Sequence, residues 1–219
     1  MADAPSCRLY LVTPPLGLGD LAAFAPRFVT ALAAGDVASA LVRVAPEAQG
    51  DARRIAERIV EAAARYDAAI LIEGEPRLAA RIGADGAHVS GIGDPLSDAL
   101  ASLRPERIVG VGALRGRDDA MAAGEAGADY VMFGEPRRDG WTPPLAETAE
   151  RVAWWAEIFQ TPCVAYAARL DDVATLAAAG ADFVALGDAL WSAPSVEQAI
   201  AAAEAAAHEA AAARAETHA

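Results

Sequence analysis

The sequence contains no lysine, because all 18 of its basic residues are arginine. The absence of lysine excludes every mechanism that forms a lysine Schiff base and every nucleotide-binding loop that depends on a lysine side chain. The 31 acidic residues leave a formal net charge of −13, so neither a nucleic acid nor an anionic membrane is an expected partner.

Cysteine and long apolar runs are scarce as well. Cys7 and Cys163 are the only cysteines, which is too few for a disulfide framework or a thiolate metal site. No apolar run reaches the roughly 18 residues that a membrane-spanning helix needs. The first residues, "MADAPSCRLYLV", show neither the basic segment nor the long apolar stretch of a secretory signal. We therefore expect a cytoplasmic protein.

The abundant residues are hydrophobic, and they recur in short runs. Hydrophobic residues make up 54% of the 219, which is enough for a sizeable buried core. Most of the runs are almost continuously apolar, as in strands of a parallel sheet that is buried on both faces. The runs cover 8–13, 37–44, 68–73, 86–90, 107–112, 129–134, 162–167 and 182–187. Segments with the composition of helices lie between and after them, at 20–34, 51–65, 76–83, 94–103, 117–126, 145–159, 171–179 and 194–214.

This alternation of strands and helices predicts an α/β protein with a single (β/α)8 TIM barrel. A doubly wound open sheet is the alternative. We expect one domain over residues 1–219, with its core at about 8–200. An Ala-rich C-terminal helix is predicted at 194–214 and is expected to fray after about residue 210.

The tripeptide Gly-Ala-Asp occurs three times, each time just before a predicted strand. The segments are "GADGAHV" at 83–89, "GADYVMFG" at 127–134 and "GADFVALG" at 180–187. Gly127 and Gly180 suit the left-handed conformation that ends many helices. The repeated part is therefore predicted to be structural. The residues that follow each strand vary, and they fall at the carboxyl-terminal rim, where barrels of this kind carry their chemistry.

The order of these motifs resembles the thiamine phosphate synthase family, including its thiazole tautomerase (TenI) branch, across roughly residues 8–200. Beside the Gly-Ala-Asp segments, "LYLVT" at 9–13 is similar to the family's opening strand. "ALVR" at 40–43 is similar to its V-Q-L-R strand, and "IVGVG" at 108–112 to its I-G-V-S strand. The resemblance implies the TIM-barrel fold and a part in thiamine biosynthesis.

The resemblance also implies a metal site whose ligands differ here. The family's synthase joins a pyrimidine pyrophosphate to a thiazole phosphate, with Mg²⁺ held by two aspartates. Gly74 and Gly93 stand at those two positions, so we expect no cofactor and a degenerate synthase site. Magnesium is expected only if the synthase activity is retained, with Glu73, Glu75 and Asp94 as its ligands.

Several residues at the predicted rim are candidates for contact with an anionic small molecule. Arg43 keeps the arginine of the family's second strand, where it either contacts such a ligand or pairs with Glu73 or Glu75. Two further arginines fall in rim loops, and an aspartate replaces the serine that begins the family's last helix. The predicted ligand-binding residues are Arg43, Arg115, Arg137 and Asp188.

The tautomerase branch suggests a proton-transfer site. In that branch a histidine follows the glycine that ends the sixth strand, and Glu135 stands in its place here. A carboxylate acts as a general base when burial raises its pKa toward neutrality, and the alternative is a solvated turn residue. The family counterpart of His88 lies near the site, and the alternative is a histidine of the barrel core. Glu135 and His88 are the predicted catalytic residues.

Three functions remain open from the sequence. The first is a binding protein or tautomerase for a small anionic or phosphorylated metabolite, with a degenerate synthase site. The second is an active thiamine-phosphate synthase, and the third is a non-catalytic subunit or regulatory partner. Trp154 and Trp155 are adjacent on the predicted helix 145–159 and cannot both face the barrel, which predicts a homodimer contact through this helix. The alternative is a tryptophan that lies across its own surface.

Overall fold

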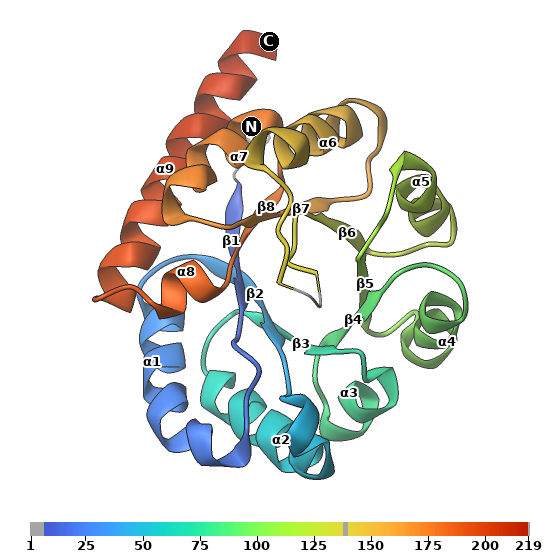
Figure 1. Ribbon diagram of the computed structural model, residues 1–219, viewed down its shortest axis with the longest axis vertical. Coiled ribbons are helices and arrows are strands. Elements are labelled where there is room, and N and C mark those ends of the chain that lie inside the picture. Colours follow the sequence, from blue (N-terminus) through green and yellow to red (C-terminus); the bar gives the residue numbers. More distant parts are fainter. Residues whose placement is uncertain (1–6, 138–139, 219) are drawn as a thin grey trace.

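The computed structural model describes residues 7–137 and 140–218. Within them, parallel strands form a closed barrel in chain order, in which β8 pairs with β1 (Figure 1). The strands are β1 (Arg8–Val12), β2 (Val37–Val42), β3 (Ala69–Glu73), β4 (Gly86–Ser90), β5 (Ile108–Gly112), β6 (Tyr130–Phe133), β7 (Cys163–Ala167) and β8 (Phe183–Leu186). The predicted TIM barrel is confirmed, and closure between β1 and β8 excludes the open sheet.

Helices surround the barrel on its outside (Figure 1). They are α1 (Leu21–Ala33), α2 (Ala52–Ala63), α3 (Pro76–Ile82), α4 (Asp94–Leu103), α5 (Arg117–Glu125), α6 (Leu145–Ile158), α7 (Val173–Ala179), α8 (Asp188–Trp191) and α9 (Val196–His218). Short 3-10 segments at Leu18–Asp20, Pro46–Asp51 and Leu170–Asp172 precede α1, α2 and α7. No predicted helical segment covers the short helix α8, although the family resemblance implies a helix that begins at Asp188.

The last helix, α9, is longer than its sequence predicts. It runs to His218 without the expected fraying after residue 210, and its C-terminal end extends past the barrel (Figure 1). Alanine has the highest helix propensity of any residue, and Ala203, Ala207 and Ala211 are buried on one face of the helix. Over the described residues, no helix combines the length and the apolar character that a bilayer crossing requires.

Helix α2 shows how the sequence sets the orientation of a covering helix. Ile55, Ile59 and Ala63 recur every four residues and are buried toward the strands. The opposite face carries the ion pairs Arg53–Glu57 and Arg58–Glu61, with nitrogen–oxygen distances of 2.7 and 2.9 Å. Burial of the apolar face therefore fixes how the helix lies on the sheet.

The barrel interior is filled by side chains. Aromatic and aliphatic residues from alternating strand positions form this inner core, which is separate from the layer between strands and helices. Its members are Tyr10, Val12, Leu41, Leu71, Tyr130, Met132, Val164, Tyr166 and Ala185. Glycine makes room for the large rings, because a Cβ on Gly110 would fall 1.9 Å from the Tyr130 ring.

The Gly-Ala-Asp repeat ties neighbouring strands together at their amino ends. The Asp85 carboxylate accepts the backbone N–H of Ile70 at 2.7 Å, and the other two aspartates repeat this contact with the strand that precedes them. Gly83, Gly127 and Gly180 have φ values of 73°, 93° and 105°, as predicted for the last two. The repeat is structural, and its aspartate side chains take the place of missing backbone acceptors.

Candidate active site

A hydrogen-bonded chain of three side chains crosses the barrel interior. The hydroxyl groups of Tyr10 on β1 and Tyr130 on β6 lie 2.8 Å apart. The Tyr130 hydroxyl also lies 2.9 Å from Nδ1 of His88, which comes from β4. All three residues are buried. His88 is thus a core histidine with a polar partner, which explains how an imidazole is accommodated among apolar side chains.

Burial keeps all three side chains neutral. It lowers the pKa of the His88 imidazole from 6.5 to about 4. It also raises the pKa of the Tyr10 and Tyr130 phenols above their ordinary value, since an anion would lose its hydration there. At neutral pH the three hydrogen-bonded side chains are therefore one uncharged imidazole and two uncharged phenols.

Glu135 follows β6 and places a carboxyl group near the hydrogen-bonded side chains of Tyr10, Tyr130 and His88. Its Oε1 accepts the backbone N–H of Ala113, which follows β5. Desolvation raises the pKa of Glu135 above its usual 4.5, while the Ala113 N–H and the charge of Arg151 act in the opposite direction. The net direction is the one that a general base requires.

Gly112 allows Glu135 and His88 to approach each other. A Cβ on this glycine would fall 2.1 Å from Oε1 of Glu135 and 2.7 Å from Nε2 of His88. Both side chains therefore border the space that any other residue would fill. The structure brings together the two predicted catalytic residues, Glu135 and His88.

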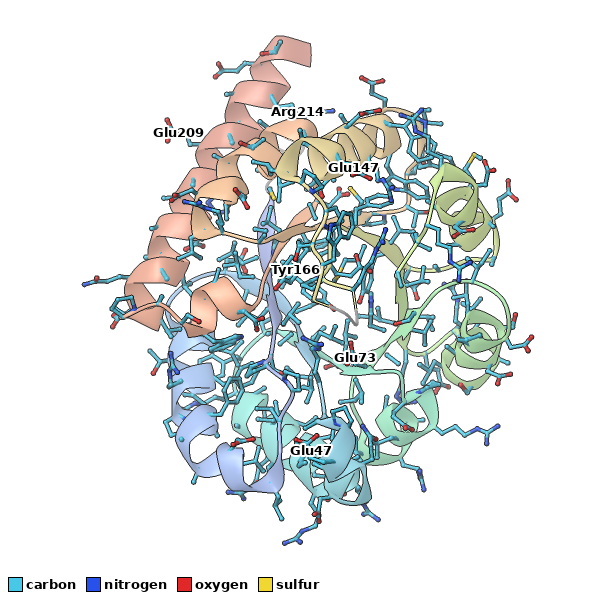
Figure 2. All side chains as sticks on the ribbon, in the orientation of Figure 1. Glu47, Glu73, Glu147, Tyr166, Glu209 and Arg214 are labelled. Atoms are coloured by element: carbon cyan, nitrogen blue, oxygen red, sulfur yellow. The ribbon has the colours of Figure 1, made fainter. Side chains whose placement is uncertain are left out.

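Arg43 and Glu73 form the next polar pair at the carboxyl ends of the strands. The Arg43 Nε lies 3.4 Å from a Glu73 oxygen, and the two side chains are 32% and 38% exposed. Of the two alternatives for Arg43, the ion pair is therefore present. In Figure 2 Glu73 and Tyr166 lie toward the middle of the barrel, whereas Glu47 and Glu209 lie at its periphery.

The other predicted ligand-binding side chains lie apart from Glu135 and His88. Arg137 is exposed, with its guanidinium 4.1 Å from the centre of the Trp141 ring. Arg115 and Asp188 are also exposed, and Asp188 is the first residue of α8. Within the part of the chain that the structure describes, none of the three makes a hydrogen bond or ion pair with Glu135 or His88. Their contact with a ligand stays a prediction.

The residues at the implied magnesium site do not fit that ion. Glu73 is engaged by Arg43, while Glu75 and Asp94 are exposed at the starts of α3 and α4. Across residues 7–137 and 140–218, no group of three His, Cys, Asp or Glu side chains could hold a metal ion. Gly93 has φ 88° and ψ −144°, a conformation that is essentially restricted to glycine. An aspartate could not replace Gly93 on this backbone.

Sequence reasoning missed the two tyrosines and Gly112. Tyr10 and Tyr130 are separated by 120 positions in the sequence, and no local pattern around either residue predicts their contact. The signal that was available is the spacing, because Tyr10 and Val12 share one face of β1 while Tyr130 and Met132 share one face of β6. That face is the barrel interior, where a phenol needs a partner.

The sequence is similar to a known protein family and to named relatives. A family model described as Thiamine monophosphate synthase matches residues 9–190. The chain is 38% identical to Thiamine-phosphate synthase of Rhodospirillum centenum over 190 residues, which is 86% of this chain and 91% of the relative. It is 34% identical to Thiamine-phosphate synthase of Hyphomonas neptunium over 197 residues, with 86% and 87% covered.

Solved structures share the barrel at lower sequence identity. Thiamine phosphate pyrophosphorylase from Pyrococcus furiosus has a TM-score of 0.75 at 22% identity, over 93% of this chain and 96% of that one. A 3-hexulose-6-phosphate synthase has a TM-score of 0.71 at 18% identity, over 90% and 99%. Because proteins of different names share the architecture, these similarities describe the fold alone.

Proposed function

The chain belongs to the thiamine monophosphate synthase family, and from this membership we propose that it is an active thiamine-phosphate synthase. The proposed reaction joins a pyrimidine carried on a pyrophosphate to a thiazole phosphate. One observation carries the proposal: relatives named as synthases align over 86% of this chain, and the family model matches residues 9–190, which include parts of all strands from β1 to β8. These relatives favour retained activity over the degenerate site that Gly74 and Gly93 suggest.

Arg43 is the residue that this proposal needs first. When the bond to the pyrophosphate breaks, negative charge grows on the departing oxygen, and a guanidinium at the rim stabilises that charge. The pair between Arg43 and Glu73 is 3.4 Å long and partly exposed, so Arg43 can exchange the carboxylate for a substrate oxygen. No step is assigned to a metal ion, because no three carboxylate, histidine or cysteine side chains among the described residues are grouped to hold one.

An assay of product formation tests the proposal directly. Purified protein is mixed with both substrates over a range of Mg²⁺ concentrations and with chelator, and thiamine phosphate is measured by chromatography and mass spectrometry. Arg43→Ala is expected to lower kcat/KM by about tenfold to a hundredfold, the range for a hydrogen bond to a charged group. Arg54→Ala on the exposed face of α2 is the control and should leave kcat/KM unchanged. A wild-type protein that makes no product under any of these conditions is not a synthase.

A second candidate function is proton transfer on a phosphorylated thiazole, with Glu135 as the general base. The observation that favours it is the desolvated Glu135 carboxyl, whose pKa is raised beside the His88 imidazole. A carboxylate in that setting removes a proton from one ring position and returns it to another, which is a tautomerisation. It requires no leaving group and no metal ion.

Deuterium exchange separates this candidate from the first. Thiazole phosphate is incubated with the protein in D2O, and incorporation of deuterium is followed by mass spectrometry. Glu135→Gln should abolish incorporation, whereas Glu57→Gln on α2 should not affect it. Absence of enzyme-dependent exchange in the wild type would remove the second candidate and leave the synthase proposal untouched.

A further inference from the structure

Neither candidate function explains the buried chain of Tyr10, Tyr130 and His88. Polar groups in an apolar interior are costly unless each has a partner, and hydrophobic residues of similar size could fill the same space. We propose that the Tyr130 hydroxyl holds His88 as the tautomer with its proton on Nε2, and that this N–H lies beside the Glu135 carboxylate as a donor for a ligand. Tyr130 is then a positioning residue that acts through His88.

The Nδ1 end of the imidazole allows two arrangements. In the first, the Tyr130 hydroxyl donates to Nδ1 over 2.9 Å and itself accepts from the Tyr10 hydroxyl over 2.8 Å. In the second, both bonds run in the opposite direction and Nδ1 is the donor. Because a neutral imidazole carries one N–H, the first arrangement leaves the proton on Nε2 and the second leaves Nε2 with a lone pair.

The Nε2 end decides between the two arrangements. Nε2 of His88 and Oε1 of Glu135 both border the space where a Gly112 side chain would lie. Oε1 already accepts the N–H of Ala113, so it presents lone pairs to its surroundings. A lone pair on Nε2 would repel this oxygen, whereas an N–H on Nε2 is attracted to it. The first arrangement is therefore the stable one.

The resulting pair over Gly112 defines the chemistry of a ligand. His88 offers an N–H donor and Glu135 offers an acceptor, and no hydrogen bond joins the two directly among the described residues. They match the edge of a heterocycle that carries a ring-nitrogen acceptor beside an acidic C–H or N–H. The substrate proton moves to the Glu135 carboxylate, which becomes a carboxyl group, and it returns to a different ring atom. No oxidant or further reactant is needed.

Nitrogen NMR of the histidine side chains tests the tautomer. The protein has three histidines, so selective 15N labelling gives few signals, and loss of one signal in His88→Gln assigns His88. The expected result is a single neutral imidazole protonated at Nε2. Tyr130→Phe should remove the preference for this tautomer, and Tyr10→Phe should preserve it because Tyr130 can still donate. A wild-type His88 protonated at Nδ1, or at both nitrogens at neutral pH, would overturn the inference.

A role of this tautomer in catalysis rests on the second candidate function. A kinetic measurement distinguishes failure of that function from failure of the assigned proton position. Tyr130→Phe should slow deuterium exchange by about tenfold to a hundredfold in kcat, with KM unchanged. Tyr10→Phe should change kcat less than threefold. Equal rates in wild type and Tyr130→Phe would refute the positioning role. An Nε2–H tautomer in a wild type that exchanges no deuterium would reject the second function and support the assigned proton position.

Discussion

The two ends of the barrel use carboxylates in opposite ways. At the amino ends of the strands, Asp85, Asp129 and Asp182 each accept a backbone N–H from the preceding strand, at 2.7 to 2.8 Å. At the carboxyl ends, Glu73 forms a partly exposed ion pair with Arg43 over 3.4 Å. The Glu135 carboxyl accepts one backbone N–H and is desolvated. The first set repeats because the backbone repeats. The second set differs from strand to strand, because its carboxylates follow the individual loops rather than the repeated backbone.

The largest effect is expected from removing an aspartate at the amino ends. Asp129→Ala leaves the Val109 N–H without its acceptor and also breaks the 2.7 Å ion pair with Arg104. We expect the free energy of unfolding to fall by about 2–3 kcal/mol, measured by urea denaturation. Asp171→Ala at the opposite end is the matched control, because its ion pair with Arg169 is exposed and should contribute less than about 0.5 kcal/mol. Equal losses for the two variants would erase the contrast between the ends.

A methyl group at the carboxyl ends should affect activity more than stability. In Gly112→Ala the new Cβ would collide with Glu135 and His88 and push them apart. We expect a loss of about 1–3 kcal/mol in stability, as for other overpacked positions, and loss of Glu135-dependent exchange. Gly116→Ala is the control, because its Cβ would meet open space and its φ of −153° suits any residue. Normal exchange in Gly112→Ala would show that the two side chains need not lie together.

Titration of Glu135 should contribute to the pH dependence of the free energy of unfolding. Because its folded pKa is raised above 4.5, the folded state holds this proton more tightly than the unfolded chain does. The stabilising contribution is complete below pH 4.5 and is lost as the pH rises through the folded pKa. Glu135→Gln removes this loss, so the stability of the variant relative to the wild type should increase with pH across that window. Urea denaturation at a series of pH values measures it, and a difference that is independent of pH would contradict the assignment.

A substitution on the outer face of helix α6 should have the smallest effect on stability. Trp155 of α6 is buried, whereas Trp154 is half-buried beneath the Arg117 guanidinium, 4.9 Å from its ring, and Ile158 is 61% exposed. Arg117 therefore covers the second tryptophan within one chain, and the homodimer stays a prediction. Ile158→Glu should change stability by less than about 0.5 kcal/mol. It should halve the molar mass in light scattering if α6 is the dimer contact, and a monomeric wild type would end that prediction.

Local patterns were sufficient to predict most of the fold. The predicted ranges of β4, 86–90, and α4, 94–103, match the structure, and the other strands differ by one or two residues at their ends. The hydrophobic runs and helical segments carry this information because each element buries a face of its own. Hydrophobic periodicity did not reveal the short helix α8, because four residues cannot show a helical period, and only the resemblance implied a helix start at Asp188.

The candidate site was only partly predictable. The positions of Glu135 and His88 came from a resemblance in the residues around them, and the Arg43–Glu73 pair came from the ends of adjacent strands. The Tyr10–Tyr130 contact could not be found this way, because it depends on which side chains meet across the closed barrel. That contact is a property of barrel closure, and no segment of the sequence contains it.

The backbone makes Gly74 and Gly93 differ in the side chains that each position can accept. Gly74 has φ 70° and open space where a Cβ would point, and aspartate is among the residues that tolerate this conformation best. Gly74→Asp is therefore expected to leave the path of this loop unchanged. At Gly93 the same substitution meets a conformation that excludes side chains, so the loop has to change its path to accept it. One substitution is therefore enough to place a carboxylate at position 74, whereas position 93 needs a redesigned loop before it can hold one.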